Sequence, residues 1–216
     1  FPNFIDPILK TSPNSRVFVI ISDALRYEVA EELAGELNRK DRIKSTLSSQ
    51  LGVLPSYTGL GMAALLPHNT IEFKLNANAD ILVDGKPSAS TEQRAKILSA
   101  YEGTAIGSEN FKSLGRDKGR EFAQKHRIIY IYHNVIDARG DKQSTEHETF
   151  AAARDTIKEL SSLVSYIVNA LNGSHVFITA DHGFLFQENY PGSSDKSGLG
   201  TKPNGTLKAK KRYLLG

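Results

Sequence analysis

The chain has 216 residues, of which 39% are hydrophobic and 24% charged, as expected for a globular domain with a sizeable core. No apolar run approaches the roughly 18 residues of a membrane-spanning helix, so we expect no contact with a membrane. The formal net charge is +3 and cysteine is absent, which excludes disulfides, thiolate metal sites and a cysteine nucleophile.

Two elements are predicted near the start of the chain. Residues 16–22 are β-branched and apolar on both faces, which is typical of a strand buried within a parallel sheet. A helix is expected from residue 25 to about 38, where Leu and Val recur at helical spacing. Residues 43–51 alternate between polar and apolar and predict a second strand, and small apolar residues predict a helix over 60–66.

The middle of the chain contains shorter elements. The segments 71–75 and 81–83, closed by Asp84-Gly85, predict a small surface hairpin. A helix is predicted from Ser90 or Thr91 to about residue 100, because either residue is a good N-cap. Residues 103–120 are rich in Gly, Ser, Lys and Arg and predict a loop, with a short helix starting near Asp117.

The last third alternates again between strand and helix. Strands are predicted at 127–132 and 175–179, and the clearest helical periodicity of the chain lies between them, over 146–172. From residue 189 onwards the composition predicts a mobile loop. Alternating strands and helices indicate an α/β fold with a mostly parallel central sheet, and we expect one domain over residues 1–216 that is truncated at its C-terminal end.

Three of the predicted buried strands lead into an acidic residue: Asp23, Asp137 and Asp181. The carboxyl ends of parallel strands form the edge of a sheet where ligands bind, so these acids can converge although they are far apart in sequence. The alternative is that each aspartate caps a helix or forms a turn. Asp181 is followed by His182, and such mixed oxygen and nitrogen ligands suit zinc and, to a lesser extent, manganese.

Two further features point to phosphate chemistry. Asp137 and Asp141 flank a Gly-containing turn, and their mutual repulsion favours a bound cation, although an exposed polar loop is the alternative. Thr58 stands where a loop turns into an apolar helix. Its hydroxyl would lie among free backbone amides, which favour an alkoxide and an approaching phosphate, but this stretch on its own favours the alternative of a simple N-cap.

These motifs, in this order, resemble the alkaline phosphatase superfamily and its PglZ domain in particular. The resemblance rests on ISDALRYE at residues 21–28, LPSYTGLGMAALLP at 54–67, YHNVIDARGDK at 132–142 and Asp-His-Gly at 181–183. It implies an alkaline-phosphatase-like fold with helices on both faces of the sheet. It also implies two divalent cations, most often Zn²⁺, bridged at a hydroxyl nucleophile that takes up the phosphoryl group before water releases it.

By position in the motifs, the resemblance assigns one cation to Asp23, Asp181 and His182, with Thr58 bridging as the nucleophile. Asp137 and Asp141 would hold the second cation. The superfamily commonly has Asp-x-x-Gly-His where this chain has Asp141 in the place of His. A later His usually completes the second site, and none follows His182 in the chain; His133 is a candidate substitute.

Two arginines are candidates for contact with the substrate phosphate, because a guanidinium matches two phosphate oxygens. They are Arg26, shortly after Asp23, and Arg139, within the acidic turn. For Arg26, an ion pair with a glutamate of its own helix is the alternative.

The expected function is a metal-dependent phosphatase or phosphodiesterase with Zn²⁺ or Mn²⁺ as cofactor. The substrate is expected to be a phosphate ester, including a nucleotide or nucleic acid. The resemblance implies a role in bacterial phage defence (BREX) together with other defence proteins, and the lack of cysteine fits a cytoplasmic location. The alternative is a catalytically inactive scaffold or binding module on the same fold.

Overall fold

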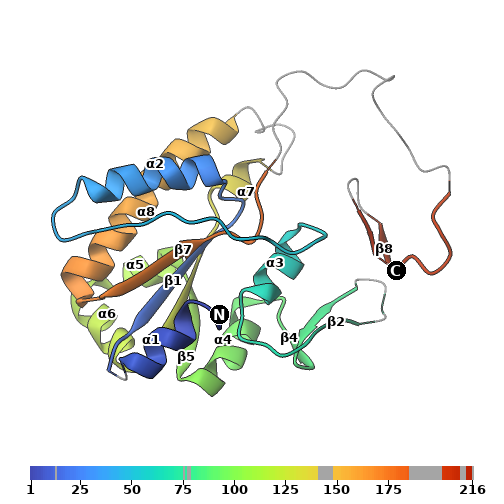
Figure 1. Ribbon diagram of the computed structural model, residues 1–216, viewed down its shortest axis with the longest axis horizontal. Coiled ribbons are helices and arrows are strands. Elements are labelled where there is room, and N and C mark those ends of the chain that lie inside the picture. The colour runs from blue at the N-terminus through green and yellow to red at the C-terminus, as the bar shows by residue number, and fades with distance from the viewer. Residues whose placement is uncertain are drawn as a thin grey trace.

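The computed structural model describes residues 1–12, 14–74, 76, 79–140, 148–184, 201–209 and 213–215. Within this part of the chain, four parallel strands form a central sheet in the order β5-β6-β1-β7 (Figure 1). These strands are β1 (Val17–Ser22), β5 (Gly103–Gly107), β6 (Ile128–His133) and β7 (His175–Thr179). The fold is therefore the α/β arrangement around a mostly parallel sheet that the sequence predicts.

Helices cover both faces of this sheet, as expected. The side chains of β1 alternate between two cores, since Phe18 and Ile20 belong to one and Val19 and Ile21 to the other. Because both faces are covered, every residue of β1 is buried. The first core is closed by α2 (Tyr27–Asn38), α5 (Ser108–Ser113), α6 (Gly115–Gln124), α7 (Ile136–Gly140) and α8 (Thr149–Leu171), and Figure 1 shows α2 and α8 side by side.

The second core lies on the opposite face of the sheet. It is closed by α1 (Ile5–Thr11), α3 (Thr58–Ala64), α4 (Thr91–Leu98) with the short 3₁₀ turn η1 (Ser99–Tyr101), and by the predicted hairpin. The hairpin consists of β2 (Ile71–Phe73), β3 (Ile81–Val83) and β4 (Lys86–Pro87), all antiparallel. Ser90 caps α4 in a capping box with Gln93, which explains why this helix begins where the sequence predicts.

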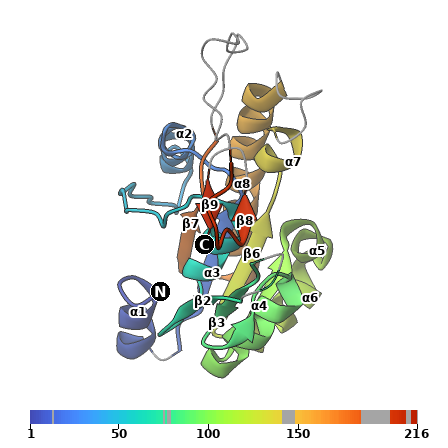
Figure 2. The same ribbon diagram turned by 90° about the vertical axis from the view of Figure 1, so that its right-hand side faces the viewer.

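The chain ends in a two-stranded ribbon. β8 (Lys208–Ala209) pairs with β9 (Leu214–Leu215), and the ring of Tyr213 stacks on that of Tyr57 with centroids 4.9 Å apart. Figure 2 shows the ribbon in front of α3, in agreement with this contact. The predicted loop from residue 189 lies outside the described residues up to residue 200.

Two predictions of secondary structure were wrong. Residues 43–51 do not form the predicted strand. Most of residues 43–50 line cavities of about 420 and 360 Å³ together with residues of β7, so the segment runs beside β7 without pairing with it. Residues 103–114 are not a loop, because they contain β5 and α5, whereas the short helix predicted near Asp117 is present as α6, which begins at Gly115. β5 is a short edge strand with Gly at both ends, and it owes its conformation to pairing with β6.

The parallel arrangement places the carboxyl ends of β1, β6 and β7 at one edge. Ser22 of β1 is in register with His133 of β6, and Ile21 with Thr179 of β7. Asp23 and Asp181, which follow β1 and β7, therefore lie at the same edge of the sheet. Among the helices of the described segments, none combines the length and apolar character needed to cross a bilayer.

Candidate metal centre

Asp23, Asp181 and His182 form a cluster at this edge. One ligand atom from each of the three residues lies within 4.8 Å of the other two. Both aspartates are buried, and the exposed fraction of the His182 side chain is 13%. Two carboxylates and an imidazole in this arrangement are a ligand set that suits a divalent cation such as zinc.

The His182 ring is oriented for coordination through one nitrogen. Nδ1 lies 2.7 Å from the carbonyl oxygen of Gly183, and because a carbonyl can only accept, Nδ1 carries the proton. In the neutral ring Nε2 is then the nitrogen with a free lone pair, and it lies 3.4 Å from Asp23 Oδ1 and 3.5 Å from Asp181 Oδ2. A hydrogen bond from the second ring nitrogen to a backbone carbonyl is the usual support of a metal-binding histidine.

The electrostatics of Asp23 also favour a cation. Burial, and then the charge of Asp181 with a smaller contribution from Asp137, raises the pKa of Asp23 from 3.8 to about 8. Asp23 Oδ1 and Asp181 Oδ2 are buried and have no hydrogen-bond partner in the described structure. Buried carboxylate oxygens without a donor are costly unless a cation binds them, so the residues present fit a divalent ion.

Thr58 adjoins this cluster. Its Oγ1 lies 2.9 Å from His182 Nε2, and because Nε2 carries no proton the hydroxyl donates. Thr58 is the first residue of α3; Tyr57 occupies the N-cap position, and it has no side-chain capping bond. The hydroxyl of Thr58 thus faces the candidate ligands and does not act as a helix cap.

Two backbone features hold α3 and the β1 loop against Asp181. A Cβ on Gly61 would overlap the carbonyl oxygen of Asp181, so only glycine lets α3 approach this closely. Ala24 has a φ of 63°, a left-handed conformation that is uncommon for alanine, and its N–H donates to Asp181 Oδ1 at 3.3 Å. The second oxygen of Asp181 remains available to a cation.

The acidic turn is only partly described. Asp137 lies in the first turn of α7, half-buried, and its charge acts on Asp23, so it is near the cluster without being one of its three members. Asp141 lies outside the described residues.

His133, the candidate substitute ligand, lies away from the three clustered residues. Its buried ring places Nδ1 3.1 Å from Ser22 Oγ and Nε2 3.4 Å from Glu159 Oε2 of α8. Burial lowers the pKa of His133 although Glu159 opposes it. Its carbonyl oxygen accepts a 2.8 Å bond from the N–H of Asp23. His133 thus supports the end of β1 from the opposite side of the sheet.

The two arginines expected to contact phosphate have acidic partners. Arg26 pairs with Glu28, the alternative left open by the sequence, and its guanidinium carbon lies 4.9 Å from the centre of the Phe184 ring. Arg139 NH1 lies 2.8 Å from Asp155 Oδ2.

The sequence analysis missed two residues beside the cluster, Arg94 of α4 and Tyr132 of β6. Arg94 is buried, and its charge lowers the pKa of Asp23 while burial raises it more. The sequence does indicate the burial of Arg94. It precedes Ile97 and Leu98 by three and four residues, so it lies on the same inward face of its helix as these buried residues.

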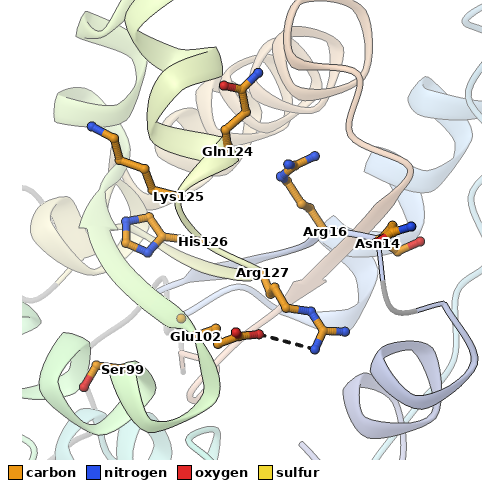
Figure 3. A pocket seen from close by; sticks show the side chains of 10 residues that line it. Asn14, Arg16, Ser99, Glu102, Gln124, Lys125, His126 and Arg127 are labelled. Atoms are coloured by element: carbon orange, nitrogen blue, oxygen red, sulfur yellow. Dashed lines mark hydrogen bonds and ion pairs between the residues drawn. The ribbon is translucent and has the colours of Figure 1, made fainter.

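A polar cavity of about 750 Å³ lies at the other edge of the sheet, where β1, β5 and β6 begin (Figure 3). Its arginines are already engaged. Arg16 Nε donates to the carbonyl of Ala123 near the end of α6, at 2.8 Å, and Arg127 pairs with Glu102 at 3.4 Å. Because this cavity lies where the strands begin, it is separate from the candidate metal centre, which lies where they end.

Comparison with known proteins identifies the family of the chain. The BREX system PglZ alkaline phosphatase-like domain matches residues 1–216. The alkaline phosphatase-like protein BrxZ of Escherichia coli O9:H4 (strain HS) is 46% identical over 215 residues, which cover 100% of this chain and 24% of BrxZ. The alkaline phosphatase-like protein PglZ of Bacillus cereus (strain H3081.97) is 45% identical over 198 residues, covering 91% of this chain and 23% of that protein.

The chain thus spans only 24% and 23% of the lengths of these two curated relatives. The match of the family over all residues, together with the parallel sheet and the Asp23–Asp181–His182 cluster at its carboxyl edge, settles the family. The chain belongs to the BREX system PglZ alkaline phosphatase-like domain family.

Proposed function

We propose that this chain carries the phosphoryl-transfer centre of a metal-dependent phosphatase or phosphodiesterase with Thr58 as nucleophile. The observation that supports this most directly is the 2.9 Å contact between Thr58 Oγ1 and His182 Nε2. It brings a hydroxyl to the one nitrogen that lies next to two buried carboxylates, Asp23 and Asp181. This is the combination that hydroxyl activation for attack on phosphorus requires.

Asp23, Asp181 and His182 would hold one divalent cation, Zn²⁺ or Mn²⁺. When bound, such a cation lowers the pKa of a neighbouring hydroxyl and neutralises charge on the transferring phosphoryl group. The chain itself supplies the orientation. Gly61 allows α3 to bring Thr58 against Asp181, and the Gly183 carbonyl fixes the ring of His182 so that Nε2 faces the hydroxyl.

The proposed reaction has two steps. Thr58 Oγ forms a bond to phosphorus while the bond from phosphorus to the ester oxygen breaks, and the hydroxyl proton ends on the departing alcohol. Water then attacks the phosphothreonine, which restores the Thr58 hydroxyl and releases phosphate from a monoester or a phosphate monoester from a diester. A threonine nucleophile also distinguishes the site from sulfatases, whose nucleophile derives from Cys or Ser.

Asp137 and Asp141 are proposed to contribute to a second cation site. The influence of Asp137 on the pKa of Asp23 supports its proximity to the first site. Metal analysis of the purified full-length protein distinguishes the enzyme from the inactive scaffold that the sequence leaves as the alternative. Two cations per chain would support two-metal hydrolysis, and no bound divalent metal would favour the scaffold.

The substrate is proposed to be a phosphate ester, with nucleotides and nucleic acid included, and the partners to be other proteins of a BREX phage-defence system. The family description names the BREX system, and the two relatives are named as alkaline phosphatase-like proteins.

The test uses the full-length protein with zinc or manganese and a chromogenic phosphate mono- or diester. Thr58→Ala is expected to reduce kcat to background, since no other hydroxyl takes its place beside His182 among the described residues. Thr58→Ser retains a hydroxyl and is expected to keep measurable turnover, with a covalent phosphoserine detectable by mass spectrometry. Normal turnover in Thr58→Ala would refute the proposal.

A further inference from the structure

Arg94 is a buried cation whose orientation is fixed by backbone atoms. It is 8% exposed, and its Nε donates to the Ser88 carbonyl at 2.8 Å while NH2 donates to the Ala89 carbonyl at 3.1 Å. These two bonds use one edge of the planar guanidinium. For the other edge, which carries the N–H groups of NH1, no hydrogen bond of ordinary geometry is found among the described residues, and the neighbouring polar group is the Tyr132 hydroxyl.

The charge of Arg94 also lacks an acidic partner. It forms no ion pair with any residue of the described segments, whereas Arg26 and Arg139 each have one. The group that its charge does reach is Asp23, whose pKa it lowers against the effect of burial. A buried charge of this kind is costly unless a counter-charge is supplied, so its position beside the cluster calls for an anion there.

Tyr132 is the second donor in the same place. The Arg94 guanidinium carbon lies 4.7 Å from the centre of the Tyr132 ring, and Tyr132 precedes His133, whose carbonyl receives the N–H of Asp23. The Tyr132 hydroxyl is buried and accepts no hydrogen bond of ordinary geometry from the described residues, although the Arg94 side chain lies close enough to lower its pKa. Burial is the main reason that its pKa is raised to about 12, so at neutral pH it is a donor.

We propose that Arg94 and Tyr132 bind the phosphate group of the substrate, with the free guanidinium edge and the phenol hydroxyl donating to its non-bridging oxygens. This inference deepens the proposed function and rests on it. A guanidinium edge and a nearby hydroxyl match the acceptors of a phosphate, which presents several oxygens to donors at once. Arg26 and Arg139 are less suited, because each would first have to leave its carboxylate.

The experiment measures binding of inorganic phosphate to the zinc-loaded full-length protein by isothermal titration calorimetry. Tyr132→Phe and Arg94→Lys are each expected to raise the Kd of phosphate about tenfold, the effect of losing one charge-assisted hydrogen bond. The matched control is Tyr130→Phe, two residues earlier on β6. It removes an equally buried hydroxyl, but one that donates to the Leu65 carbonyl at 2.7 Å, so the Kd is expected to stay unchanged.

Thermal unfolding of each variant identifies loss of folding. If Arg94→Lys unfolds, Tyr132→Phe still tests the proposal, because it removes one hydroxyl that makes no hydrogen bond to the backbone of the described residues. Unchanged phosphate binding in Tyr132→Phe and in a folded Arg94→Lys would overturn the proposal, as would loss of binding in Arg26→Ala alone. A wild-type protein that binds no phosphate would overturn it as well.

The outcome is independent of turnover. If Thr58→Ala retains full hydrolysis, the proposed nucleophile is wrong, yet phosphate binding by Arg94 and Tyr132 is still measured in the same titration. If Thr58→Ala is inactive and the two variants bind phosphate normally, only the present inference fails.

Discussion

Asp23 carries much of the electrostatic character of the site. Burial and the neighbouring Asp181 raise its pKa to about 8, so without a metal it keeps its proton at neutral pH. A divalent cation must displace this proton, and cation binding is therefore expected to strengthen as the pH rises toward 8. The same shift also makes the stability of the metal-free protein depend on pH.

The sign of that dependence follows from the two states of the chain. The pKa of Asp23 is near 3.8 when it is unfolded and about 8 when it is folded. Between these values the folded protein holds a proton that the unfolded chain releases, so stability falls as the pH rises through this window, by up to about 1.4 kcal/mol per pH unit. In Asp23→Asn this contribution is absent.

Urea unfolding in the presence of a chelator, at several pH values from 5 to 9, checks this prediction. The wild type is expected to lose stability relative to Asp23→Asn as the pH rises to 8, with a constant difference above it. Parallel stability curves for the two proteins would contradict a raised pKa.

Among the helices, α3 is the element that positions Thr58, the proposed nucleophile, and its close approach to Asp181 depends on one glycine. Gly61→Ala places a methyl group on the Asp181 carbonyl, so α3 or the Asp181 loop must shift. We expect a loss of about 1–3 kcal/mol of stability, typical of overpacking, and weaker zinc binding because the Thr58–His182 contact is disturbed.

The control is Gly35→Ala on α2. A Cβ there meets only the flexible end of Arg39, 3.8 Å away. Because alanine is more stable than glycine in a helix, the free energy of unfolding is expected to rise by about 0.5–1 kcal/mol. Chemical denaturation and zinc titration of both variants test the pair. Equal stability of Gly61→Ala and the wild type would show that α3 does not pack on Asp181 in this way.

For the whole molecule, the cluster joins segments that are far apart in the chain. Asp23 follows β1, whereas Asp181 and His182 follow β7. A cation bound between them would therefore link two loops that are far apart in the sequence. Because the cluster does not exist in the unfolded chain, zinc is expected to stabilise the folded state by about 2.7 kcal/mol at one hundred times its Kd.

Thermal unfolding of the full-length protein with zinc and with a chelator measures this effect. The shift is expected to disappear in Asp181→Asn and to persist in Glu36→Gln, which changes an exposed acid paired with Arg39. An equal zinc shift in wild type and Asp181→Asn would place the metal elsewhere.

Much of the fold and part of the site could be predicted from the sequence. β1, β6 and β7 are recognisable because a parallel strand covered on both faces must be apolar throughout, and α8 because its apolar face repeats at helical spacing. The rule that ligands gather at the carboxyl edge then pointed to Asp23, Asp137 and Asp181. Asp23 and Asp181 do meet, together with His182, whereas Asp137 is not one of the three clustered residues. Those predictions depend only on local pattern and on one general property of parallel sheets.

Tertiary structure decided the rest, because pairing and side-chain direction depend on remote segments. β5 is a strand since β6 lies beside it, and residues 43–50 are not, since they run past β7 without pairing. The His133 ring faces Ser22 and Glu159, on the other side of the sheet from Arg94, whose burial is set by packing of α4 against β5 and by its contact with the Tyr132 ring of β6. The sequence by itself therefore determined three strands of the sheet, β1, β6 and β7, and the acids that follow them, and only the packing of distant elements decided the fourth strand and which side chains share that edge.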